Sequence, residues 1–171
     1  NYYYGRENTP DSDGFKFFVW DAEWSLTLRS KNGTNLINDF SGVAAPWRSI
    51  RESAEFRLLF ADRAHKHLFN GGVLYVDPEN PEWDPEHPER NVPAAMYVAQ
   101  AENVYQGLIA ESARWGDQHR STPRTRDVDW QREYDKLLRS WFPERSFDLL
   151  DLFKQLDLYP NTDVPTFNQR G

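Results

Sequence analysis

Two carboxylates near the start of the sequence directly follow a segment that is typical of a β-strand. Asp21 and Glu23 come after residues 15–20, Phe-Lys-Phe-Phe-Val-Trp, whose aromatic and β-branched side chains favour extended structure. The end of a strand is a rigid and open position, which suits a residue that takes part in chemistry. Such carboxylates can bind a divalent metal, or they can cap a turn and stay in solvent.

A hairpin would bring a third polar side chain to the same position. Residues 2–4, Tyr-Tyr-Tyr, predict a first strand, and residues 5–14 are rich in turn-forming residues. In an antiparallel pair, the residue before the first strand and the residue after the second lie at the same end. We therefore expect the Asn1 amide oxygen close to the Asp21 carboxylate, and such an all-oxygen pair suits Mg²⁺.

The composition limits the classes of function that the chain can have. With 171 residues, the chain is long enough for one domain or for part of a larger one. It has no cysteine, which excludes disulfides and Cys-based zinc or thiol chemistry. Its net charge of −7 disfavours binding to nucleic acid, and its apolar runs are too short for a membrane span. An aromatic content of 15% argues for a packed core.

The predicted fold is α+β and predominantly helical. The hairpin occupies residues 1–24, and apolar residues then recur at helical spacing through most of residues 46–158. This spacing predicts about four to five helices. A loop insertion is expected at residues 76–93, and an extended exit segment at residues 159–171.

Capping residues and prolines set the expected ends of the helices. Ser53 is a plausible N-cap for a long helix that ends at residues 70–72, Asn-Gly-Gly. A single helix is expected over residues 94–115, with Gly116 after it. A helix that starts near Asp127 or Asp129 should be broken by Pro143, and Ser146 can cap the last helix.

Residues 76–93 hold five prolines and six acids around Trp83, which is typical of a surface loop. Little in this loop could bury an indole, so an interaction surface at Trp83 is one interpretation. The tryptophans at helical spacing are instead expected in the core; these are Trp115, Trp130 and Trp141.

The remaining charged groups have ordinary interpretations beside the functional ones. His65 and His67 are two residues apart on a helix and point in different directions, so a shared metal is not expected. Arg120, Arg124 and Arg126 form a small basic cluster. This cluster fits a solvated loop, or a contact with phosphate or with an acidic substrate tail.

The N-terminal pattern resembles the CotH-type kinase family, which is named for spore-coat proteins. That family shows an Asn followed by aromatic residues, and then a strand that ends in Trp-Asp-x-Asp or Trp-Asp-x-Glu; here Asn1 and Trp20-Asp21-Ala22-Glu23 occupy these places. The resemblance covers most of the chain outside the 76–93 loop, and beyond the N-terminal pattern it is carried by residues 55–72, 109–117, 141–145 and 158–160.

The resemblance implies the C-terminal part of a divergent protein-kinase-like domain that uses ATP and Mg²⁺ or Mn²⁺. Asp21 would take the role of the metal-binding Asp of the kinase Asp-Phe-Gly motif, and Asn1 that of the catalytic-loop Asn. Glu23 falls where the family often has a second acid. The implied partners are a protein substrate, phosphorylated on Ser or Thr, and the remaining N-terminal part of the kinase domain. A bacterial extracellular, cell-surface or spore-coat location is expected.

The family's ATP-holding Lys, its partner Glu and the catalytic-loop Asp have no counterpart in the sequence. In the family they precede the Asn, so the catalytic Asp is expected upstream of Asn1. The chain also starts with Asn1 instead of Met, and we expect a fragment that is inactive by itself. One alternative is a non-catalytic surface or coat module on a kinase-like scaffold. Another is an α-rich hydrolase that uses the carboxylate pair, although the sequence shows no nucleophile or base signature for it.

Overall fold

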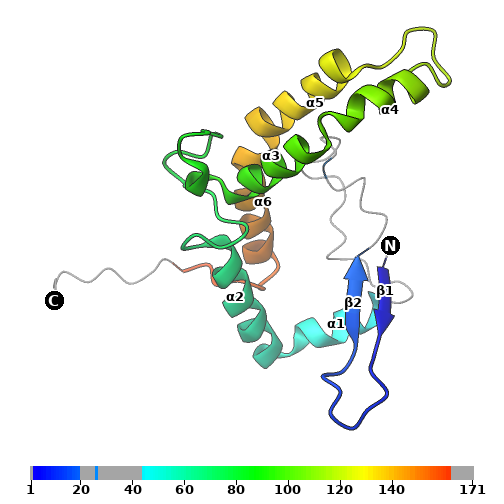
Figure 1. Cartoon of the computed structure of the whole chain (residues 1–171). Helices are drawn as coiled ribbons and strands as arrows, with labels where there is room; N and C mark the ends of the chain where they lie inside the picture. The colour runs from blue at the N-terminus through cyan, green and yellow to red at the C-terminus, as the bar shows by residue number, and fades with distance from the viewer. Residues whose placement is uncertain (1, 20–25, 27–43, 163–171) are drawn as a thin grey trace. The chain divides into compact units, whose positions relative to one another are not determined.

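A computed structural model describes residues 2–19, residue 26 and residues 44–162 (Figure 1). The chain divides into two compact units, residues 1–30 and residues 31–171, which are described separately. The first unit contains a β-hairpin, and the described part of the second is helical. This confirms the prediction of a predominantly helical chain with an N-terminal hairpin.

The hairpin pairs β1 (Tyr2–Gly5) with β2 (Lys16–Val19) in antiparallel register. Tyr2 lies opposite Val19, and Gly5 lies opposite Lys16. The ring of Tyr4 meets the ring of Phe15 edge to face at 5.8 Å. Gly14 has a φ of +92°, which a residue with a side chain rarely adopts, and it lets the chain turn into β2.

The helical unit opens with α1 (Ala45–Glu52) and α2 (Ala54–Leu68). Ser53 caps α2 as predicted, because its Oγ accepts a hydrogen bond from the amide of Phe56 at 3.3 Å. The predicted stop is also confirmed, since Asn70 and Gly71 both have positive φ and turn the chain away from the helix.

Two helices replace the single helix that was predicted over residues 94–115. Helix α3 (Val92–Val104) and helix α4 (Gly107–Trp115) are separated at Tyr105 and Gln106. The amide of Tyr105 bonds to the carbonyl of Glu102, three residues back, and not to the carbonyl four residues back. This tighter turn ends α3, and the flexible Gly107 follows it.

A nearly continuous helical run follows, and it corrects two predictions. It consists of the π-helical turn η4 (Arg126–Trp130), α5 (Gln131–Lys136), the π-helical turn η5 (Leu137–Trp141) and α6 (Phe142–Gln155). Pro143 does not break the run, because it lies in the first turn of α6, where a missing amide costs little. Ser146 is not a cap: it lies inside α6, and its Oγ donates to the carbonyl of Leu74 at 2.7 Å.

The core of this unit gathers side chains from α3, η5 and α6. It contains the buried residues Ala94, Leu137, Leu138 and Phe142, with Tyr97, Tyr134, Trp141 and Trp83 packed against them. The premise that little could bury the indole of Trp83 is therefore wrong, since the indole packs against the core and is partly buried. The core position predicted for Trp115 is also wrong, because this residue is 46% exposed.

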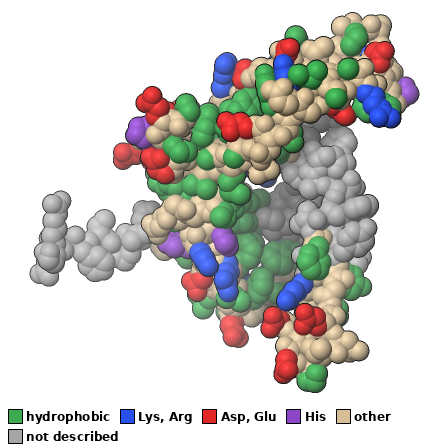
Figure 2. Space-filling view, viewed as in Figure 1, with side chains coloured by type: hydrophobic (Ala, Val, Ile, Leu, Met, Phe, Trp, Pro, Cys, Tyr) green, Lys and Arg blue, Asp and Glu red, His purple; other side chains and the backbone are tan. Residues whose placement is uncertain are grey.

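The loop that carries Trp83 is held by a buried asparagine. Asn91 is fully buried, and its Nδ2 donates to the carbonyl of Pro81 at 2.8 Å. Its Oδ1 accepts from the amide of Ala94 at 3.0 Å, so the same side chain caps α3. A bridge between Val76 and Asn91 closes the base of the loop. Acidic side chains cover the outside of this loop, which also contains the short 3₁₀ helix η3 (Pro88–Arg90) (Figure 2).

We expect Asn91→Ala to lower the free energy of unfolding by roughly 2–4 kcal/mol, because it removes a helix cap and leaves buried polar groups without partners. Urea unfolding of the chain measures this change. The matched control is Asn80→Ala, since Asn80 is exposed in the same loop and should change stability by less than about 0.5 kcal/mol. Equal stability of the two variants would contradict the role given to Asn91.

Candidate functional site

The predicted metal ligands Asn1, Asp21 and Glu23 lie outside the described residues. The strands that lead to them are described up to Tyr2 and Val19, which lie directly opposite each other. The hairpin register therefore agrees with the expectation that was built on antiparallel pairing. The proximity of Asn1 and Asp21 themselves remains a prediction.

The described residues offer no second candidate for a metal centre. Within them, no group of three His, Asp or Glu side chains could hold a metal ion. The Nδ1 atom of His65 lies 2.9 Å from the Tyr159 hydroxyl, and the His65 ring stacks on Phe69 at 4.7 Å. His65 thus ties the end of α2 to the segment after α6. None of the helices described here is sufficiently long and apolar to cross a membrane.

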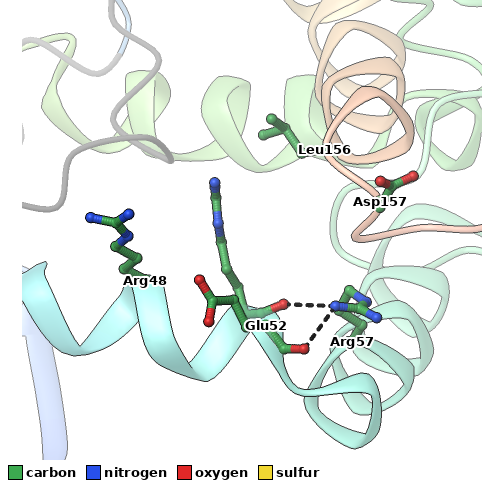
Figure 3. Close-up of a pocket in the computed structure, with 6 residues that line it drawn as sticks. Arg48, Glu52, Arg57, Leu156 and Asp157 are labelled. Carbon is green, nitrogen blue, oxygen red and sulfur yellow. Dashed lines mark hydrogen bonds between the residues drawn. The ribbon is translucent and has the colours of Figure 1, made fainter.

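A pocket of about 670 Å³ lies between α1, the start of α2 and the end of α6 (Figure 3). Arg48, Arg51 and Arg57 line it together with Glu52 and Asp157. Arg57 points back to the end of α1, where its Nη1 donates to the carbonyls of Arg51 at 3.2 Å and Glu52 at 3.0 Å. A cation that satisfies the last carbonyls of a helix stabilises that end, so Arg57 has a structural role here.

A second pocket, of about 590 Å³, is formed by α4, the following loop, η4 and the first turn of α5. We call it the arginine groove, because Arg120, Arg124, Arg126 and Arg132 all line it. The sequence identified the first three as a basic cluster, and it missed Arg132 and the exposed Trp115, which also line the groove. Their contribution depends on the turn after α4, which no local pattern predicts.

Two ion pairs set the electrostatics of the arginine groove. Arg132 and the amide of Thr125 both bond to the Asp129 carboxylate, and the backbone bond is the main cause of its lowered pKa. The Nε of Arg126 donates to the Asp127 carboxylate at 2.6 Å, which raises the pKa of the guanidinium. The two carboxylates pair with two of the four arginines.

Comparison with known proteins found no relative of the chain. No family model matches the chain, and neither curated proteins nor solved structures gave a match. The class of protein that the structure defines is therefore a helical unit with an N-terminal hairpin. A more specific assignment depends on the residue pattern of that hairpin.

The structural role of Arg57 can be tested by its effect on the stability of the chain. We expect Arg57→Ala to lower the free energy of unfolding by about 1 kcal/mol, because the last carbonyls of α1 lose a charged donor. Urea unfolding provides the measurement. Arg63→Ala is the control on the same helix, since Arg63 is exposed. An Arg57 variant as stable as the Arg63 variant would show that the two bonds do not stabilise α1.

Proposed function

We propose that the chain is the C-terminal part of a CotH-type kinase-like domain. The parent protein would transfer phosphate from ATP to Ser or Thr of a protein substrate, at a bacterial surface or spore coat. One observation carries the proposal: in the sequence, Asn1 directly precedes β1 and Trp20-Asp21-Ala22-Glu23 directly follows β2, and these two strands pair in antiparallel register. The similarity of residues 55–72 and 109–117 to the family supports it further.

The donor chemistry of the three predicted ligands fits a divalent cation. Asp21 and Glu23 supply carboxylate oxygens and Asn1 supplies an amide oxygen, which are the ligands that Mg²⁺ takes in phosphate-transfer sites. Bound Mg²⁺ would neutralise charge on the ATP phosphates. In this proposal Asp21 holds the metal, Asn1 shares it, and Glu23 adds negative charge beside them. The paired strands β1 and β2 would support such a set at one end of the hairpin.

The chain alone should not transfer phosphate. Phosphoryl transfer requires positioned phosphates and a residue that orients the attacking hydroxyl. The family's Lys, Glu and catalytic Asp serve these purposes, and no residue of the chain matches them. With radiolabelled ATP, Mg²⁺ and a generic protein substrate, we expect the 171-residue chain to give only background labelling. Labelling above background would contradict this expectation.

The full-length parent protein provides the test of the metal site. We expect Asp21→Asn to reduce phosphate transfer at least about 100-fold, because a neutral amide binds Mg²⁺ weakly and leaves phosphate charge uncompensated. The matched control is Asp11→Asn, which removes an exposed carboxylate from the turn of the same hairpin and should leave the rate unchanged.

Two results would contradict the kinase proposal. One is equal activity of the Asp21 variant and the unaltered protein. The other is no transfer by the unaltered full-length protein under any divalent cation. The second result would favour the alternative of a non-catalytic surface or coat module, in which the kinase-like scaffold serves binding.

A further inference from the structure

The arginine groove has a fixed wall. After α4 the chain turns back, and the amide of Arg124 donates to the carbonyl of Gly116 at 2.8 Å. The amide of Arg126 donates to the Oγ of Ser112 at 2.9 Å. A Cβ at Gly116 would collide with the carbonyl oxygens of Arg124 and Ser112, so only glycine permits this approach. The backbone that carries Arg124 is therefore held against the end of α4.

Two guanidinium groups in the groove form no direct ion pair with the described residues. Arg126 and Arg132 are engaged by carboxylates, as described above. Arg120 and Arg124 are exposed, and neither forms a side-chain hydrogen bond or ion pair within the ranges 2–19 and 44–162. The charge of Arg124 still acts on the nearby Asp129 carboxylate and helps to lower its pKa. In the view of Figure 2, Lys and Arg side chains are visible at the loop end of α4.

The groove also offers apolar surface beside this charge. The indole of Trp115 is 46% exposed, and the guanidinium carbon of Arg114 lies 4.9 Å from the centre of its ring. Trp130 contributes a second, half-buried indole to the lining. Tryptophan and arginine are the residues that most often dominate binding energy at protein interfaces. The combination suits a peptide, whose backbone and side chains can cover an indole while a carboxylate meets an arginine.

The charge of the rest of the chain argues against a nucleic acid as the occupant. The chain carries a net charge of −7, and three carboxylates, Glu111, Asp129 and Glu133, also line the groove. A long polyanion would have to pass these groups, whereas a short acidic segment needs only the local excess of positive charge. We propose that the arginine groove binds an acidic peptide segment of a partner protein, with Arg120 and Arg124 meeting its carboxylates and Trp115 its apolar side chains.

Such docking is possible whether or not the parent protein transfers phosphate. The test uses the 171-residue chain and a fluorescent synthetic peptide rich in Glu and Asp with one aromatic residue, followed by fluorescence anisotropy. We expect saturable binding that weakens as salt is added, because exposed charges are screened. The double variant Arg120→Gln/Arg124→Gln should bind at least about tenfold more weakly, which corresponds to ~1.4 kcal/mol. Trp115→Ala should also weaken binding.

A charge-matched control separates local recognition from the overall charge. Arg63→Gln/Arg139→Gln removes the same charge from exposed positions outside the groove, and it should bind within about twofold of the unaltered chain, less than ~0.5 kcal/mol. Circular dichroism shows whether both double variants keep their helices. As a second measurement, the emission of tryptophan in the unaltered chain should change on binding, and this change should shrink in Trp115→Ala.

Several results would overturn the proposal. One is equal binding of the acidic peptide and its amide analogue, in which Gln and Asn replace Glu and Asp. Another is equal weakening by the two double variants. Tighter binding of a single-stranded oligonucleotide of the same charge would assign the groove to nucleic acid instead. Because no ATP or Mg²⁺ is present, a negative result here leaves the phosphate-transfer assay unaffected.

Discussion

The packing of the helical unit depends on the buried side chain of Asn91. Its two hydrogen bonds join the start of α3 to the loop at Pro81, and the bond to the Ala94 amide is buried, where water cannot replace a lost partner. The conformation of the loop and the first turn of α3 are therefore fixed together. Trp83, two residues after Pro81, is placed on the core as a consequence. A segment with the composition of a surface loop thus contributes one of the largest apolar side chains of the core.

Two π-helical turns explain how the run after Thr125 serves more than one contact surface. Each π turn adds a residue to the helix, and one added residue rotates all later side chains by about 100°. Trp130, the last residue of η4, stacks on Tyr134 of α5 at 5.1 Å, and Tyr134 stacks on Tyr97 of α3 at 5.6 Å. After η5, Phe142 meets Tyr97 at 5.2 Å. Residues of α5 and of the start of α6 therefore both pack on Tyr97 of α3.

Local signals were sufficient to predict the hairpin and several ends of helices. The strands at Tyr2–Gly5 and Lys16–Val19 follow from aromatic residues that flank a turn, and the Ser53 cap depends on one side chain and one amide. The predictions failed where a distant partner decides the outcome. Trp83 is packed by residues of α3, η5 and α6, and Ser146 bonds to Leu74 across a long stretch of sequence.

The two candidate sites also differ in whether local sequence or a distant contact determines them. A sequence motif can identify Asn1, Asp21 and Glu23 as metal ligands, because their residue types and their positions beside two predicted strands indicate oxygen ligands at one place. The arginine groove could be anticipated only in part. Its arginines are close in sequence, but its shape comes from a turn that brings Arg124 back to Gly116.

Net charge and local charge lead to different conclusions about binding. The value of −7 includes the six acids of the 76–93 loop, most of which are exposed, and their charge is screened beyond about 10 Å at ordinary salt. A ligand in the arginine groove responds mainly to the side chains that line it, where four arginines face three carboxylates. The acidic composition therefore disfavours an extended polyanion, for which every nearby charge counts. It does not disfavour a short acidic segment, whose charges can stay within reach of Arg120 and Arg124.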